Sequence, residues 1–79
     1  MYFRDFQAAL EQQGLTVEAR NGFIRNAINS RFIGMVTAKD LINTPIEVNR
    51  VTLISADITP VKAARAICLL HGVEVTTEY

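Results

Sequence analysis

Hydrophobic residues recur at helical spacing near the start of the chain. One arc of a helix over residues 2–13 would carry Tyr2, Phe3, Phe6, Ala9 and Leu10. Arg4, Glu11 and Gln12 fall on the other side. Gly14 is typical of the position just after a helix. The pattern predicts an amphipathic helix over residues 2–13.

A second helix is predicted over residues 60–71. Thr59 is a favourable N-cap, Pro60 suits the first helical position, and Gly72 suits the left-handed position after the end. This helix is apolar nearly all round. One arc holds Val61, Ala64, Ile67 and Cys68, and the opposite arc holds Ala63, Ala66 and Leu70. Lys62 and Arg65 form the polar strip, and Leu69 falls inside it. We therefore expect another chain to supply part of its cover.

Period-two alternation and β-branched residues predict four strands. Residues 15–20 and 73–78 alternate apolar and polar side chains, and residues 32–36 form a short apolar run. Residues 46–54 are rich in β-branched residues, but their alternation changes phase. A bulge near Asn49-Arg50 would explain that change.

The stretch after Arg20 has two interpretations. Asn21-Gly22 favours a tight hairpin turn, but Asn21 is also a fair N-cap. In a helix over residues 22–31, one side would carry Phe23, Ile24, Ala27 and Ile28. We favour the helix over a hairpin strand. A further short helix is predicted over residues 38–43, stopped by Pro45.

These elements predict a single α+β domain over residues 1–79. About three helices would pack on one mainly antiparallel sheet. Strand 46–54, helix 60–71 and strand 73–78 would form a right-handed βαβ unit if the two strands share the sheet.

Composition limits the class of protein. The chain has 79 residues, 49% hydrophobic and 20% charged, with zero net charge, which is typical of a small globular domain. No apolar run approaches the ~20 residues of a membrane span, and the N-terminus does not resemble a signal peptide. A single cysteine cannot form an internal disulfide, so we expect a cytoplasmic protein. The initial Met suggests a complete small gene product.

Catalytic and metal-binding chemistry is not predicted. Cys68 and His71 lie three residues apart on one helix, but a metal site needs three or four ligands. The acidic residues are scattered, and the four glycines form no phosphate-binding motif. We expect no metal, no cofactor and no enzymatic activity.

The mildly basic segment 20–50 offers one candidate surface. On the favoured helix, Arg25, Asn26 and Asn29 would project together, and arginine and asparagine are the side chains that read guanine and adenine. Arg20 and Arg31 could hold phosphates. A solvated or protein-binding face has the same composition, and zero net charge weakens phosphate binding.

Our preferred hypothesis is a small protein-binding regulator or inhibitor that occupies a partner protein's surface as a homo-oligomer. An antirepressor or antitoxin of bacterial or phage type would fit. The predicted interface consists of Lys62, Arg65, Leu69 and Leu70. Strand 73–78 is a second self-pairing candidate. The alternative is a DNA- or RNA-binding regulator using segment 20–50.

Overall fold

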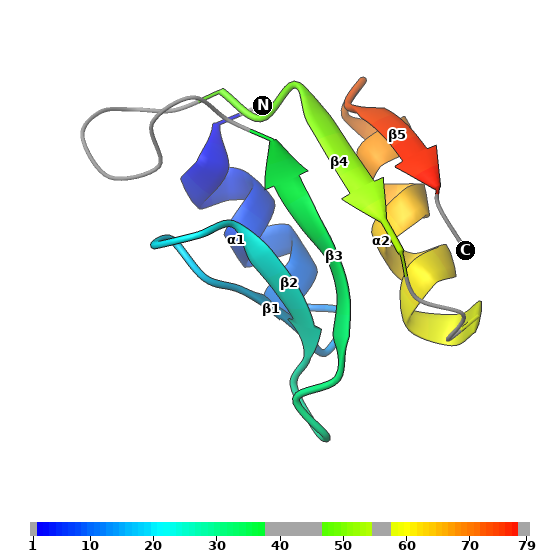
Figure 1. Ribbon diagram of the computed structural model, residues 1–79. Helices are drawn as coiled ribbons and strands as arrows, with labels where there is room; N and C mark the ends of the chain where they lie inside the picture. Colours follow the sequence, from blue (N-terminus) through cyan, green and yellow to red (C-terminus); the bar gives the residue numbers. More distant parts are fainter. Residues whose placement is uncertain (1, 38–46, 55–57, 78–79) are drawn as a thin grey trace.

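The computed structural model describes residues 2–37, 47–54 and 58–77, which form one mixed sheet with two helices. Figure 1 shows the arrangement. The elements are α1 (Phe3–Glu11), β1 (Leu15–Val17), β2 (Phe23–Asn26), β3 (Phe32–Thr37), β4 (Arg50–Leu53), α2 (Ile58–Leu70) and β5 (Glu74–Thr77). This confirms the α+β class.

The five strands lie side by side in chain order. β1 to β4 form an antiparallel meander, and β5 then pairs with β4 in parallel. α2 lies between these two parallel strands in the chain, because strands that run in the same direction need a crossover connection. The right-handed βαβ unit expected for this part of the chain remains a prediction.

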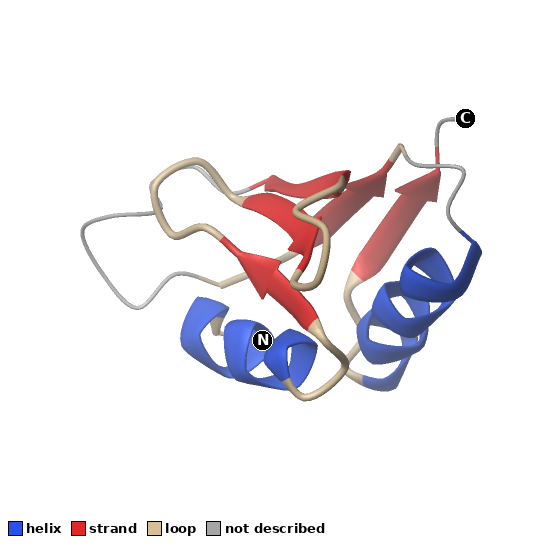
Figure 2. Cartoon of the chain, turned by 90° about the horizontal axis from the view of Figure 1, so that it is seen from below, coloured by secondary structure: helices blue, strands red, loops and turns tan. Residues whose placement is uncertain are grey.

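Both helices cover the same face of the sheet (Figure 2). The inward-facing strand residues and the helix residues that meet them form one core. Its completely buried members include Phe6, Leu10, Leu15, Ile24, Ile33, Val51, Leu53, Ala64 and Cys68. The opposite face of the sheet, which we call the open face, carries the alternate strand residues, so the fold has two layers.

The amphipathic N-terminal helix is confirmed. At Phe3–Glu11 it is slightly shorter than the predicted range of residues 2–13. Phe3, Phe6 and Leu10 are buried against the sheet. Gly14 follows the helix with a φ of 75°, a left-handed conformation that glycine adopts without steric cost. The chain can therefore turn directly into β1.

The helix predicted over residues 22–31 is wrong, because this stretch contains β2 and a turn. Its apolar residues do not share one face: Ile24 is buried toward the helices, whereas Ile28 is exposed. The hairpin interpretation of Asn21-Gly22 is correct, although the connection is longer than a two-residue turn. The Oδ1 of Asn21 accepts a hydrogen bond from the Phe23 amide at 2.9 Å, and Gly22 has a φ of 74°.

Residues 46–54 differ in detail from the prediction. β4 begins at Arg50, so the change of phase marks the start of the strand rather than a bulge within it. The irregularity lies between β2 and β3, where pairing shifts between Ile24 and Arg25 and leaves Ile33 as the extra residue. The short helix predicted over 38–43 lies outside the described residues.

The C-terminal helix is confirmed, although it starts at Ile58, so Thr59 lies inside its first turn instead of capping it. In the described part of the chain, neither helix is long and apolar enough to cross a membrane.

Candidate functional site

The side of α2 that faces away from the sheet carries two exposed leucines. Leu69 and Leu70 keep 71% and 79% of their surface exposed. Lys62 and Ala66 are exposed on the same side, and Arg65 is half-buried at its flank. We call Lys62, Ala66, Leu69 and Leu70 the α2 outer surface. It contains three of the four predicted interface residues, with Arg65 beside it.

Helical spacing explains why these side chains remain exposed. The buried residues of α2 are Val61, Ala64, Ile67 and Cys68, which occupy one arc against the sheet. One sheet face can cover only that arc. Ala66 and Leu70 on the far arc are therefore left exposed in the single chain. Cover by another chain remains a prediction.

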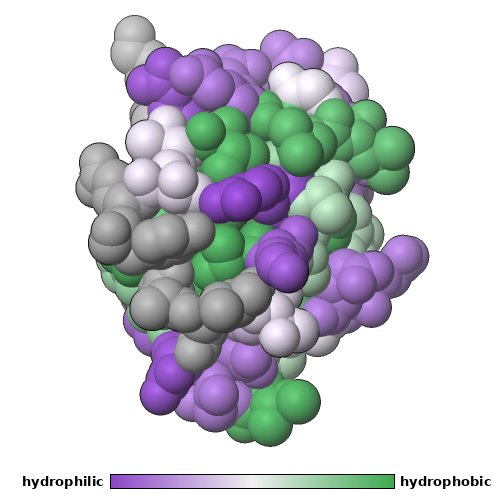
Figure 3. Space-filling view, turned by 90° about the vertical axis from the view of Figure 1, so that its right-hand side faces the viewer, coloured by the Kyte–Doolittle hydropathy of each residue, from purple (hydrophilic) through white to green (hydrophobic). Residues whose placement is uncertain are grey.

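The end of α2 holds the two leucines in place at the surface. The amide of Val73 donates to the carbonyl of Cys68 at 2.8 Å, and the amide of His71 donates to that of Ile67 at 3.2 Å. Gly72 has a φ of 71°, as expected for the residue that ends a helix. Hydrophobic residues gather on the upper part of this side of the molecule, with hydrophilic residues between and below them (Figure 3).

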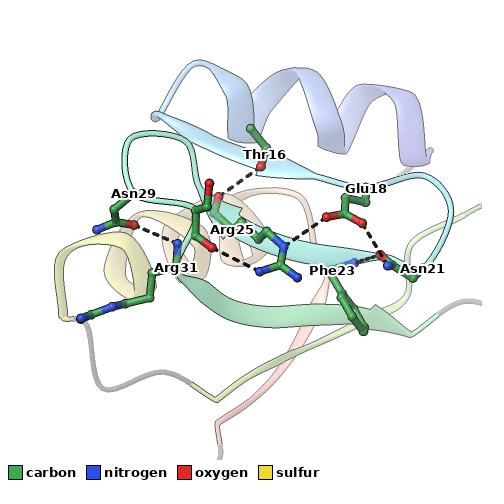
Figure 4. Close-up of polar contacts among 8 residues, drawn as sticks. Thr16, Glu18, Asn21, Phe23, Arg25, Asn29 and Arg31 are labelled. Carbon is green, nitrogen blue, oxygen red and sulfur yellow. Dashed lines mark hydrogen bonds and ion pairs between the residues drawn. The ribbon is translucent and has the colours of Figure 1, made fainter.

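A second cluster lies on the open face, centred on Arg25 (Figure 4). Its Nε donates to Oε1 of Glu18 at 3.1 Å, and its Nη1 donates to the Ser30 carbonyl at 3.2 Å. The guanidinium carbon lies 5.9 Å and 5.8 Å from the ring centroids of Phe23 and Phe32. The two rings meet edge to face at 5.1 Å. Arg25 therefore connects β2 to the loop that follows β1 and to the turn before β3.

The turn between β2 and β3 forms a third surface feature. We call residues 27–30 the hairpin tip. Ile28 stands on it with 93% of its surface exposed. The Oδ1 of Asn26 accepts from the Ile28 amide, and the Oδ1 of Asn29 accepts from the Arg31 amide, each at 2.9 Å. These side chains replace missing backbone partners and fix the shape of the turn.

The predicted nucleic-acid face is not assembled as expected. Arg25 and Asn26 are neighbours on a strand, so their side chains point to opposite faces of the sheet. Asn29 and Arg31 belong to the turn at one end of β2, and Arg20 belongs to the loop at its other end. Arg25, Asn26 and Asn29 therefore do not project together as they would on the predicted helix, and Arg20 lies at the far end of β2 from Arg31.

Cys68 and His71 are also separated by burial. Cys68 is completely buried, and His71 is exposed at the end of α2. Burial raises the pKa of the Cys68 thiol from 9.0 to about 11, because the thiolate would lose its hydration. Among the described residues, no three His, Cys, Asp or Glu side chains come together as a metal site would require.

Two features of the surface were missed at the level of sequence. Glu18 pairs with Arg25 across two strands, and no local pattern marks such a pair. The sequence predicted Ile28 on one side of a helix together with Phe23, Ile24 and Ala27. Its flanking asparagines, Asn26 and Asn29, were the available signal, because asparagine often closes turns through its own side chain.

Comparison of the chain with protein-family models, curated proteins and solved structures finds no match.

Proposed function

We propose that this chain is a non-enzymatic regulator or inhibitor that binds another protein and works as a homo-oligomer. The observation that carries the proposal is the exposure of Leu69 and Leu70, two adjacent large apolar side chains on one helix. Exposed leucines beside lysine and arginine form an apolar centre with a polar rim, which is the usual anatomy of a protein interface. Antirepressors and antitoxins are examples of this class.

The molecule offers separate surfaces for self-association and for a partner. We assign self-association to the α2 outer surface. We assign partner binding to the hairpin tip, where Ile28 projects from a turn that is already fixed by hydrogen bonds. A preformed apolar knob can enter a pocket of another protein with little loss of conformational entropy. A cytoplasmic location is part of the proposal, since the single cysteine gives no internal disulfide.

Capture from the native host tests the proposal. The purified chain is immobilised and incubated with nuclease-treated host extract. Ile28→Ser removes the knob, and Ala27→Ser is the matched control on the same exposed turn. We expect one protein to be retained in near-stoichiometric amount by the wild type and by Ala27→Ser, and to be lost with Ile28→Ser. Equal retention by all three chains, or no retained protein, would count against the assignment.

A second candidate function is the binding of single-stranded nucleic acid on the open face. The observation that favours it is the pair of half-buried rings, Phe23 and Phe32, beside the guanidinium of Arg25. Against it, Glu18 neutralises Arg25, and the chain has zero net charge. We therefore rank it below protein binding.

A further inference from the structure

The side chains of the α2 outer surface differ in size from one end of the helix to the other. Leu69 and Leu70 supply bulk at the C-terminal end, and Ala66 leaves a small residue in the middle. Lys62 and Ala63 occupy the N-terminal half of the helix, with less apolar bulk. A surface with two leucines at one end, a small alanine in the middle and a flexible lysine at the other end can pair with a copy of itself turned end to end.

Helix geometry gives the matching positions. If two α2 helices run antiparallel and cross at Ala66, each residue faces the partner residue that is equally far from Ala66 in the opposite direction. Leu69 and Leu70 of each copy then lie level with Ala63 and Lys62 of the other. The small Ala66 side chains at the crossing allow the helix axes to approach within the usual packing range of about 8–10 Å.

Charge favours the same orientation. The C-terminal end of a helix carries a partial negative charge, and lysine side chains are stabilised beside it. The antiparallel arrangement places the ammonium of Lys62 next to that end of the other helix, while its methylene chain covers leucine. A parallel arrangement would instead bring the two Lys62 ammonium groups together and stack leucine on leucine at one end.

The position of α2 in the fold leaves this approach open. α2 lies at one edge of the molecule, beneath the edge strand β5, and α1 covers the same face of the sheet toward β1 (Figures 1 and 2). Lys62, Ala66, Leu69 and Leu70 are exposed in the single chain. A second copy can therefore reach them without rearrangement of the described core.

We propose that two copies of this chain pair through antiparallel α2 helices that cross at Ala66, so that Lys62 and Ala63 of each copy cover Leu69 and Leu70 of the other. This pairing rests on the self-association part of the proposed function and defines its geometry. A contact of one helix per copy belongs to the smaller class of interfaces, below about 1,200 Å² in total, so dissociation in the micromolar range is expected.

Disulfide trapping tests the geometry with the purified chain. All variants carry Cys68→Ala, so that each introduced cysteine is the sole thiol. Ala66→Cys places thiols on the two-fold axis, within the Cβ separation of about 4 Å that a disulfide needs. Ala8→Cys is the matched control, because Ala8 is also an exposed helical alanine but lies on α1. A mixture of Lys62→Cys and Leu70→Cys chains tests the orientation, and circular dichroism checks that every variant is folded.

We expect Ala66→Cys to form a covalent dimer at least tenfold faster than Ala8→Cys under mild oxidation. The mixed Lys62→Cys and Leu70→Cys sample should give mainly the heterodimer. Equal rates for Ala66→Cys and Ala8→Cys would overturn the pairing, and preferential Leu70→Cys homodimers would overturn its antiparallel orientation. Retention of a host protein by the wild-type chain alongside either negative result would leave protein binding supported and this geometry refuted.

Discussion

The Nε of Arg25, on β2, donates a hydrogen bond of 3.1 Å to Oε1 of Glu18, the residue that follows β1. The side chains are 35% and 44% exposed, so solvent screens the pair and its contribution to stability is small. Its larger consequence concerns charge. The arginine nearest the open-face rings already has a carboxylate partner, which lowers the attraction of this face for phosphate groups.

The chain should therefore bind nucleic acid weakly and without sequence preference. Phosphate neutralisation dominates such affinities, and the net charge of the chain is zero. In a mobility-shift assay at about 150 mM salt, we expect no complex with single- or double-stranded probes at sub-micromolar protein. A retarded band that Arg25→Ala abolishes would instead support the nucleic-acid function.

Gly34 should tolerate no side chain. A Cβ at this position would meet the carbonyl oxygen of Thr52 and lie 3.0 Å from a methyl group of Leu53. Backbone atoms of paired strands cannot move aside easily, so Gly34→Ala should lower the free energy of unfolding by at least about 2 kcal/mol. Urea denaturation measures this change. A loss below about 0.5 kcal/mol would show that β3 and β4 lie farther apart than described.

Replacing Ser30 with glycine should leave the stability of the folded chain unchanged or raise it. Its φ of 60° is left-handed, which costs a residue with a Cβ roughly 1–2 kcal/mol. Glycine removes that cost but loses more entropy on folding, so Ser30→Gly should be neutral or stabilising by up to about 1 kcal/mol. Ser30→Val is the informative counterpart, because a β-branched side chain at this φ should destabilise the hairpin tip. Equal unfolding midpoints for the two variants would argue against this turn geometry.

Cys68 should make stability fall at high pH. Burial raises the thiol pKa from 9.0 to about 11 in the folded chain. The unfolded chain therefore loses this proton first, and the thiol's contribution is complete below pH 9 and is lost as the pH rises through about 11. The slope between these values should approach about 1.4 kcal/mol per pH unit. The Cys68→Ala chain should not show this loss of stability between pH 9 and pH 11. If the unfolding free energies of both chains depend on pH in the same way, the prediction is refuted.

Elements that bury one side could be predicted from the spacing of their hydrophobic residues. In α1, the spacing of Phe3, Phe6 and Leu10 matches the buried face that the structure shows. Gly14 and Gly72 were recognisable as helix-ending residues, because both need the left-handed conformation that the structure gives them. Helical spacing placed Leu69 and Leu70 away from the arc of α2 that faces the sheet, and both are exposed in the structure.

The hairpin between β2 and β3 shows where periodicity fails. Phe23 and Ile24 are adjacent and face opposite sides of the sheet, and Ile28 sits on a turn, yet their spacing imitates one side of a helix. The β2–β3 irregularity at Ile33 weakens the alternation that would have revealed strands. Long-range pairs such as Glu18 with Arg25 depend on register, which single-strand patterns do not specify.

Leu69→Asp should shift the chain toward monomer without unfolding it. The side chain is mostly exposed in the single chain, so the monomer should lose no more than about 1.5 kcal/mol of stability, from the lower helix propensity of Asp and its charge at the negative end of α2. In the paired state the carboxylate would replace the apolar contact of Leu69 and lose part of its hydration, a cost that the nearby Lys62 ammonium of the other copy offsets only in part. Ala8→Asp supplies the charge control on α1, and sedimentation velocity compares the two. An unfolded Leu69→Asp chain would place Leu69 in the core instead.

The molar mass of the wild-type chain in solution tests the central claim most directly. The monomer has a mass of 8.8 kDa. Light scattering at about 100 µM, followed by dilution to about 1 µM, should show a species of twice that mass that dissociates on dilution. A monomer at every concentration would contradict self-association through α2.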